Sequence, residues 1–223
     1  MPIPPILYED EFLLFVDKPA GLVVQRGYDQ DEPVLLDMVR DYLAAKGEET
    51  FLLQRLDRGT TGAIFFSKSS KMNVRLTRQF ETKRIKKLYA AFCIGLLAEP
   101  QLVDAPIARI GAINFGVRDE GKRSLTRIVP LEPGLERSLV EVHLLTGRTH
   151  QIRVHLSAIG HPLVGDWLYG DRDRGRPMLH ARRVEMIHPA TGQPLIVESP
   201  LPEDFESMRR AGDGSLERDR EPK

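Results

Sequence analysis

The chain has 223 residues, 41% of them hydrophobic, and equal numbers of basic and acidic side chains, 32 of each. No apolar stretch approaches the roughly 20 residues that a membrane helix needs, and the N-terminus has neither the basic start nor the apolar segment of a secretory signal. Cys93 is the only cysteine, which excludes an internal disulfide and a cysteine-based zinc site. We therefore expect a cytoplasmic globular protein that needs no metal.

The charges are unevenly distributed along the chain. Residues 51–127 hold 15 Lys and Arg against 6 Asp and Glu, whereas residues 1–50 hold 4 against 11. Such asymmetry is typical of a protein that presents one basic face to nucleic acid. Charges that mix over the folded surface would explain the same counts equally well.

Apolar spacing in the first half of the chain predicts both strands and helices. We expect a strand at 12–16, a helix at 34–45, a buried strand at 62–67, a helix from residue 69 or 70 through residue 80, and a strand at 88–94. The Lys-Pro-Ala-Gly run at 18–21 marks a turn, and Ser69 or Ser70 would cap the second helix.

The second half begins with a stretch rich in Gly, Pro and charge at 100–137, which we expect to form loops and a flexible hairpin. A strand follows at 139–145, then a helix capped by Thr149 with Ile152, Leu156 and Ile159 on its buried side. Strands at 179–187 and 195–197 close the fold. The pattern predicts an α+β protein with a mixed or mostly antiparallel central sheet, a single domain at 1–202 and a charged, disordered tail at 203–223.

Several common catalytic motifs are missing. The sequence contains neither a G-x-x-x-x-G-K-[ST] phosphate loop nor a G-x-S-x-G nucleophile elbow. His150, His155 and His161 lie close in sequence but lack a carboxylate or thiolate partner at metal-ligand spacing. We interpret them as hydrogen-bonded polar groups of a helix and its exit loop.

Asp57 remains as the candidate for chemistry. It lies between Arg55 and Arg58 in a short segment flanked by apolar runs, so core elements anchor this loop at both ends. In an extended segment Arg55 and Asp57 point the same way and Leu56 points toward the core. The alternative is an ion pair of Asp57 with Arg55 or Arg58 in a surface turn, and spacing alone gives catalysis only modest support.

Five blocks of the chain resemble the RluA family of RNA pseudouridine synthases. "QRLDRGTTG" at 54–62 is similar to the family signature H-R-L-D-x-x-T-S-G. "YEDEFLLFVDKPAGLVV" (8–24), "FETKRIKKLYAAF" (80–92), "LLTGRTHQIRVHLSAIGHPLVGDWLYG" (144–170) and "MLHARRV" (178–184) match further family blocks in the same order. The resemblance implies the pseudouridine synthase catalytic fold, isomerisation of uridine to pseudouridine in RNA, and no cofactor.

The resemblance also implies residue roles. Asp57 matches the essential aspartate, which either attacks C1′ of the ribose or removes the C2′ proton. Tyr89 matches the active-site tyrosine, whose ring stacks on the flipped uracil and whose hydroxyl assists proton transfer. Arg153 matches the arginine that would pair with the aspartate and hold it ionised. Leu179 matches a residue that packs against the target base, and for Arg55 we expect a contact with the RNA stack or a phosphate.

A cationic face would bind the RNA backbone. Residues 68–89 hold eight positive side chains against one acidic residue, Glu81. The expected phosphate-binding residues are Lys68, Lys71, Arg75, Arg78, Lys83, Arg84, Lys86 and Lys87, with Arg118, Lys122 and Arg123 closing over the RNA from the loop-rich segment.

Two positions depart from the family signature. Gln54 stands where the family has histidine, and Thr61 stands where it has serine. Because neither matched position is the nucleophile, we expect activity to survive.

The expected partner is tRNA, large-subunit rRNA or both, bound by a monomer without an accessory N-terminal domain. An inactive family member that acts as an RNA chaperone is the alternative. A small-molecule isomerase that uses Asp57 and Arg153 is a further one, which the basic segment disfavours.

Overall fold

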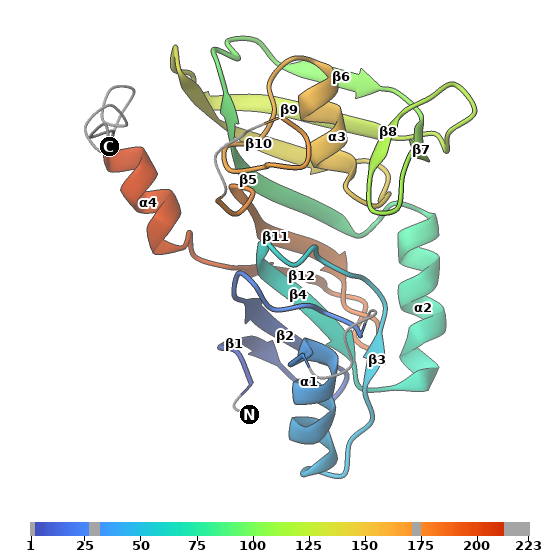
Figure 1. Cartoon of the computed structure of the whole chain (residues 1–223). Helices are drawn as coiled ribbons and strands as arrows, with labels where there is room; N and C mark the ends of the chain where they lie inside the picture. Colours follow the sequence, from blue (N-terminus) through green and yellow to red (C-terminus); the bar gives the residue numbers. More distant parts are fainter. Residues whose placement is uncertain (1–2, 27–31, 171–174, 212–223) are drawn as a thin grey trace. The chain divides into compact units, whose positions relative to one another are not determined.

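The computed structural model describes residues 3–26, 32–170 and 175–211 (Figure 1). The chain divides into two compact units, one formed by residues 1–89 and 180–200 and the other by residues 90–179 and 201–223. Strand β5 (Lys86–Ile94) runs from the first unit into the second, and the chain returns at the start of strand β11 (Leu179–Ile187). Each unit combines a sheet with helices, which confirms the α+β prediction.

The first unit is built around strand β4 (Thr61–Ser67), in which every residue is buried. On one edge β4 pairs antiparallel with β2 (Leu13–Lys18), which pairs in turn with β1 (Ile6–Glu9). On the other edge it pairs antiparallel with the short β3 (Phe51–Leu52) and parallel with β11, beside which β12 (Pro194–Glu198) lies antiparallel. The sheet is therefore mixed, as the sequence predicts.

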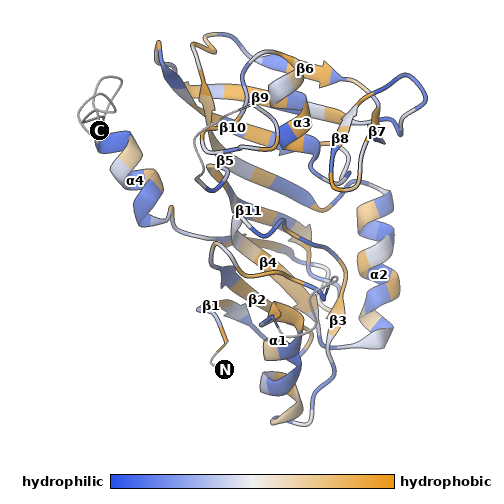
Figure 2. Ribbon diagram, viewed as in Figure 1, coloured by the Kyte–Doolittle hydropathy of each residue, from blue (hydrophilic) through white to orange (hydrophobic). Residues whose placement is uncertain are grey.

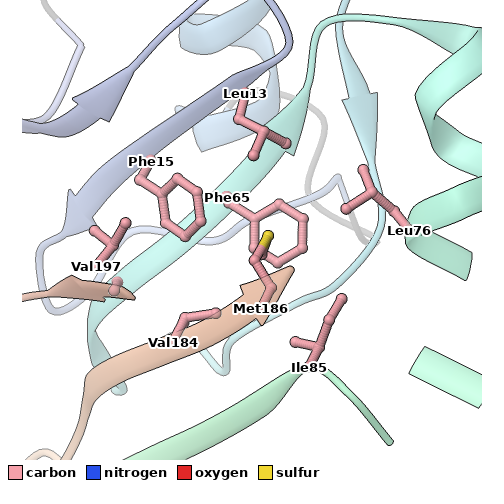
Figure 3. Packing of buried hydrophobic residues seen from close by; sticks show 9 residues of the cluster. Leu13, Phe15, Phe65, Leu76, Ile85, Val184, Met186 and Val197 are labelled. Carbon is pink, nitrogen blue, oxygen red and sulfur yellow. The ribbon is translucent and has the colours of Figure 1, made fainter. Parts of the chain in front are cut away.

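Two helices belong to this unit, α1 (Leu35–Ala44) and α2 (Ser70–Glu81). Both confirm the expected helices, and α2 ends one residue later than expected. Hydrophilic and apolar residues alternate along α2 (Figure 2), as in a helix that buries one stripe. Leu76 of α2 packs into a core with Phe15, Phe65 and Met186 from three neighbouring strands (Figure 3). Ser69 is the N-cap residue of α2, but its side chain makes no capping hydrogen bond.

The second unit has the strand order β5, β10 (Arg137–Leu144), β9 (Leu125–Glu132) and β6 (Gln101–Asp104). A separate hairpin joins β7 (Ile107–Arg109) to β8 (Phe115–Val117). The hairpin expected within 100–137 is confirmed, but much of this stretch forms sheet strands instead of loops. Buried Thr126 and Ile128 alternate with half-buried and exposed residues on β9, a strand pattern that the Gly- and Pro-rich flanks obscured.

The helices of the second unit correct two predictions. Helix α3 (Gln151–Ala158) begins after His150, which has a left-handed backbone (φ 55°), and Thr149 is exposed and does not cap it. The tail predicted to be disordered from residue 203 contains helix α4 (Glu203–Arg210), while residues 212–223 lie outside the described part. One aromatic residue anchors α4: Phe205 is buried and packs against Phe92 at 5.5 Å between ring centroids.

Among the described residues, no helix is long and apolar enough to cross a membrane.

Candidate active site

Asp57 lies in a loop of the first unit, at residues 53–60 between β3 and β4. Leu56 is buried, Arg55 is exposed and Asp57 is half-buried, which is the alternation that the sequence predicts. The Thr60 amide donates to the Asp57 carbonyl at 3.1 Å and closes a tight turn. The carboxylate is therefore presented on a short loop between core strands.

Lys18, at the end of β2, holds this loop from the protein interior. Its side chain is fully buried, and its ammonium donates to the carbonyls of Pro19 (2.9 Å), Leu22 (2.7 Å) and Arg58 (3.0 Å). The Gly21 amide donates to the same Arg58 carbonyl at 2.9 Å. The sequence showed a Lys-Pro turn here but not its partner, because residue 58 is 40 positions away.

The guanidinium of Arg58 forms a two-point ion pair with Glu32. This contact holds the turn after Asp57 from the solvent side. The carboxylate that pairs with Arg58 is therefore Glu32, whereas the sequence suggested Asp57.

The loop ends in a tightly packed strand junction. The Thr61 hydroxyl lies 2.9 Å from Nδ1 of the buried His180, so threonine supplies a hydrogen bond at the position where the family has serine. Gly62 has φ +107°, and a Cβ at this residue would lie 2.3 Å from the Ala181 carbonyl oxygen. Only glycine allows β4 and β11 to approach this closely.

Gln54 occupies the position of the family histidine and is buried, with 9% of its surface exposed. Its Nε2 is shielded from solvent and has no hydrogen-bond partner among the described residues. A buried donor without a partner is costly, so the structure offers no compensation for the departure from histidine.

Tyr89 lies on β5 in the first unit and is only 5% exposed. Burial raises the pKa of its hydroxyl, and the negative charge of Asp57 raises that pKa further. Two residues that are 32 positions apart in the sequence are therefore close enough to interact electrostatically. The hydroxyl keeps its proton at neutral pH and is available as a hydrogen-bond donor.

Arg153 is 7% exposed and lies on α3 in the second unit. Its Nε and Nη2 donate to the two carboxylate oxygens of the fully buried Asp166, both at 2.7 Å. The guanidinium also lies 4.9 Å from the centroid of the Tyr169 ring. Sequence reasoning missed Asp166, whose only signal was a carboxylate inside the block "GDWLYG".

The pairing of Arg153 with Asp57 stays a prediction of the family motif, because the two residues belong to different units. Leu179, also assigned to the second unit, is buried with 4% exposure.

The expected cationic face is only partly as predicted. Lys68 is buried, with ion pairs to Glu9 (3.2 Å) and Glu48 (2.7 Å), so its assignment to phosphate binding is wrong. Lys87 is half-buried. The other cationic residues of α2 and of the segment that follows it are exposed, namely Lys71, Arg75, Arg78, Lys83, Arg84 and Lys86.

Some of these cations have protein partners. Arg75 donates to the Pro189 carbonyl at 2.7 Å, and Lys86 lies 3.6 Å from Glu185. Burial lowers the pKa of Lys87 to about 8, and its ammonium lies 5.7 Å from the centroid of the Phe80 ring. Lys71, Arg78, Lys83 and Arg84 are the residues best placed by exposure to meet an anion.

In the second unit, Arg118, Lys122 and Arg123 are exposed near the β7–β8 hairpin. Arg123 lies 3.5 Å from Asp104, at the end of the neighbouring β6. This exposed pair is weak, and it leaves the Arg123 guanidinium accessible to a phosphate.

The three closely spaced histidines are hydrogen-bonded polar groups, as the sequence suggested. His155 lies 2.8 Å from the Thr126 hydroxyl and 2.9 Å from the Ala105 carbonyl. His161 lies 2.9 Å from the Ile94 carbonyl, and His150 contacts the Tyr169 hydroxyl at 2.7 Å.

Comparison with known proteins identifies the family. Residues 12–158 match the model of the RNA pseudouridylate synthase family. The chain is 39% identical over 220 residues to ribosomal large subunit pseudouridine synthase D of Pseudomonas aeruginosa, covering 90% of this chain and 69% of that protein. It is 37% identical over 227 residues to tRNA pseudouridine synthase C of Salmonella typhi, covering 90% and 86%.

Among solved structures, human RNA pseudouridylate synthase domain containing 4 superposes with a TM-score of 0.77 at 26% identity, covering 92% of each chain. The fold is therefore that of a pseudouridine synthase. The chain belongs to the RNA pseudouridylate synthase family, and it is an enzyme that isomerises uridine in RNA.

Proposed function

We propose that this enzyme converts a uridine of tRNA, large-subunit rRNA or both to pseudouridine, with Asp57 as the catalytic carboxylate. The names of the related bacterial enzymes support both RNA classes. A monomeric state, a cytoplasmic location and a reaction without a cofactor remain predictions from the sequence.

The observation that carries the assignment is the electrostatic interaction between Asp57 and Tyr89. A buried, protonated tyrosine beside a half-buried carboxylate combines a flat apolar ring with a neutral hydroxyl donor. The ring suits an unstacked uracil, and the hydroxyl suits proton transfer during reattachment of the base through C5. Asp57 then acts on the ribose, either at C1′ or on the C2′ proton.

We assign Arg153 and Leu179 to the same reaction from the family motifs. Arg153 would hold the Asp57 carboxylate ionised, and Leu179 would pack against the target base. The two hydrogen bonds that Arg153 donates to the Asp166 carboxylate support the role of Arg153, because they fix the guanidinium in one orientation.

The target uridine must leave its stack to reach Asp57, which costs a few kcal/mol. Contacts from exposed cations to phosphates would offset that cost, and Arg55, exposed two residues before Asp57, is placed on the loop to take part. Affinity for RNA should then fall steeply as salt concentration rises.

The test uses unmodified transcripts of tRNA and of large-subunit rRNA in separate reactions, with pseudouridine mapped at single-nucleotide resolution. We expect new sites with the wild-type enzyme and none with Asp57→Asn, which keeps the shape of the side chain but removes its charge. Asp41→Asn, an exposed carboxylate on α1, is the matched control and should behave as wild type. Absence of new sites in both RNAs would contradict the proposal.

A further inference from the structure

Trp167 is the only tryptophan of the chain, and 58% of its surface is exposed. Scattered exposed apolar residues are ordinary, but an indole is the largest apolar side chain and is usually mostly buried. Its position is also unusual: it directly follows Asp166, the carboxylate that holds Arg153.

The turn that carries Trp167 is rigidly held. Gly165 has φ +76°, and a Cβ there would lie 2.2 Å from the Arg176 carbonyl oxygen. The Asp166 carboxylate accepts hydrogen bonds from Arg153 and from the Leu168 amide, and the Asp166 carbonyl accepts from the Tyr169 amide at 3.1 Å. An exposed indole on a backbone fixed in this way is preorganised for contact.

Other exposed apolar side chains lie on a segment tied to the same turn. The Tyr169 hydroxyl accepts a hydrogen bond from the Phe115 amide of β8 at 3.0 Å. The tip of that hairpin carries Ile110 and Ile113, which are 50% and 58% exposed. Tyr169 therefore links two segments of the second unit that each present apolar side chains to solvent.

We propose that Trp167 is a stacking platform for an unpaired base of the RNA substrate. The inference rests on the proposed function. Trp167 directly follows Asp166, which holds Arg153, and Arg153 is assigned to the reaction only in that proposal. When a nucleotide leaves the stack, its neighbours lose a stacking partner. An indole face replaces that partner for any base, without reading its identity.

The first test uses the intrinsic emission of Trp167, which no other tryptophan obscures. The Asp57→Asn variant, which we expect to bind RNA without turnover, is titrated with bulk tRNA and with heparin, a polyanion without bases. Stacking predicts that tRNA quenches the emission and heparin does not. Equal quenching by both would show that charge, not base contact, changes the indole environment, and would overturn the proposal.

The second test separates binding from chemistry. Stacking on one base is worth about 1–3 kcal/mol, so Trp167→Ala should raise KM for the RNA about 5-fold to about 150-fold with little change in kcat. Trp167→Phe should restore most of the affinity. Leu102→Ala, which removes a 65% exposed side chain from β6, is the control and should leave KM unchanged.

An unchanged KM in Trp167→Ala would refute the proposal. A shift of the Trp167 emission with protein concentration in the absence of RNA would also refute it, because the indole would then contact a second copy of the chain. Failure of the proposed function gives a different result: the wild-type enzyme then makes no pseudouridine, whatever the emission does.

Discussion

Substitutions of Lys83 can separate its effect on the stability of the fold from its effect on RNA binding. At the end of α2 the Arg84 amide donates to the Gln79 carbonyl at 2.8 Å and the Lys83 amide donates to the Phe80 carbonyl at 3.2 Å. These two bonds form a Schellman motif, in which the residue at the position of Lys83 is usually glycine. Lys83 has φ 56°, in the left-handed region that costs a non-glycine residue about 1–2 kcal/mol.

Replacement of Lys83 by glycine should therefore stabilise the protein. The relief of about 1–2 kcal/mol is partly offset by the entropy that glycine loses on folding, about 0.5–1 kcal/mol. The net gain of about 1 kcal/mol corresponds to a rise of about 2–4 °C in the melting temperature. The same variant loses an exposed cation, so the slope of log affinity for RNA against log salt should become shallower by about 1.

Two further variants separate these effects. Lys83→Ala removes the charge but keeps the backbone strain, so its salt slope should also become shallower by about 1, without a gain in stability. Lys83→Arg should match wild type in both respects. The assays are thermal unfolding and filter binding of tRNA at several salt concentrations. A Lys83→Gly variant with a wild-type salt slope would refute the phosphate contact, and one without added stability would refute the strain argument.

Three other substitutions test the loop and the strand that frame Asp57. Gly62→Ala should lower the free energy of unfolding by about 2–6 kcal/mol, because its Cβ meets the Ala181 carbonyl at 2.3 Å with a strained backbone; an unchanged midpoint in urea would contradict this. Lys18→Met removes the ammonium that bonds three carbonyls, of which, among the described residues, only that of Arg58 keeps another donor, the Gly21 amide. The variant should lower kcat more than it changes KM in single-turnover and steady-state assays; unaltered kcat would show that the loop keeps its conformation without Lys18. Burial lowers the pKa of Lys87 to about 8, so the unfolded state binds more protons between about pH 8 and pH 10.4, and stability rises with pH over this range; Lys87→Met should lack that rise in urea unfolding, and a parallel pH profile would contradict the shift.

The sequence predicted the local elements of the first unit well because their signals are local. The buried run at 61–67 and the helical spacing after residue 69 each lie within one element. The alternation of Arg55, Leu56 and Asp57 likewise predicts which side chain faces the core.

Long-range partners were not predictable in the same way. From the sequence, Lys18 is only part of a turn, but in the structure its ammonium bonds the distant Arg58 carbonyl. The sequence likewise suggests that Lys68 is a surface cation, whereas in the structure it pairs with Glu9 and Glu48. Helix α4 was missed for a related reason. Its sequence is mostly charged, and packing through Phe205 and Met208 favours helix formation.

The buried charges of the two units point to a common physical requirement. Lys18 in the first unit and the Arg153–Asp166 pair in the second are costly to remove from water, and apolar residues of similar size often give equal or greater stability. What such residues offer is fixed geometry, because an ammonium with three carbonyl partners or a two-point guanidinium–carboxylate pair permits few arrangements. Lys18 immobilises the loop of Asp57, and Asp166 immobilises Arg153 and the turn of Trp167. A reaction that detaches a base, turns it and rejoins it depends on positioning, and each unit uses a buried charge where positioning is needed.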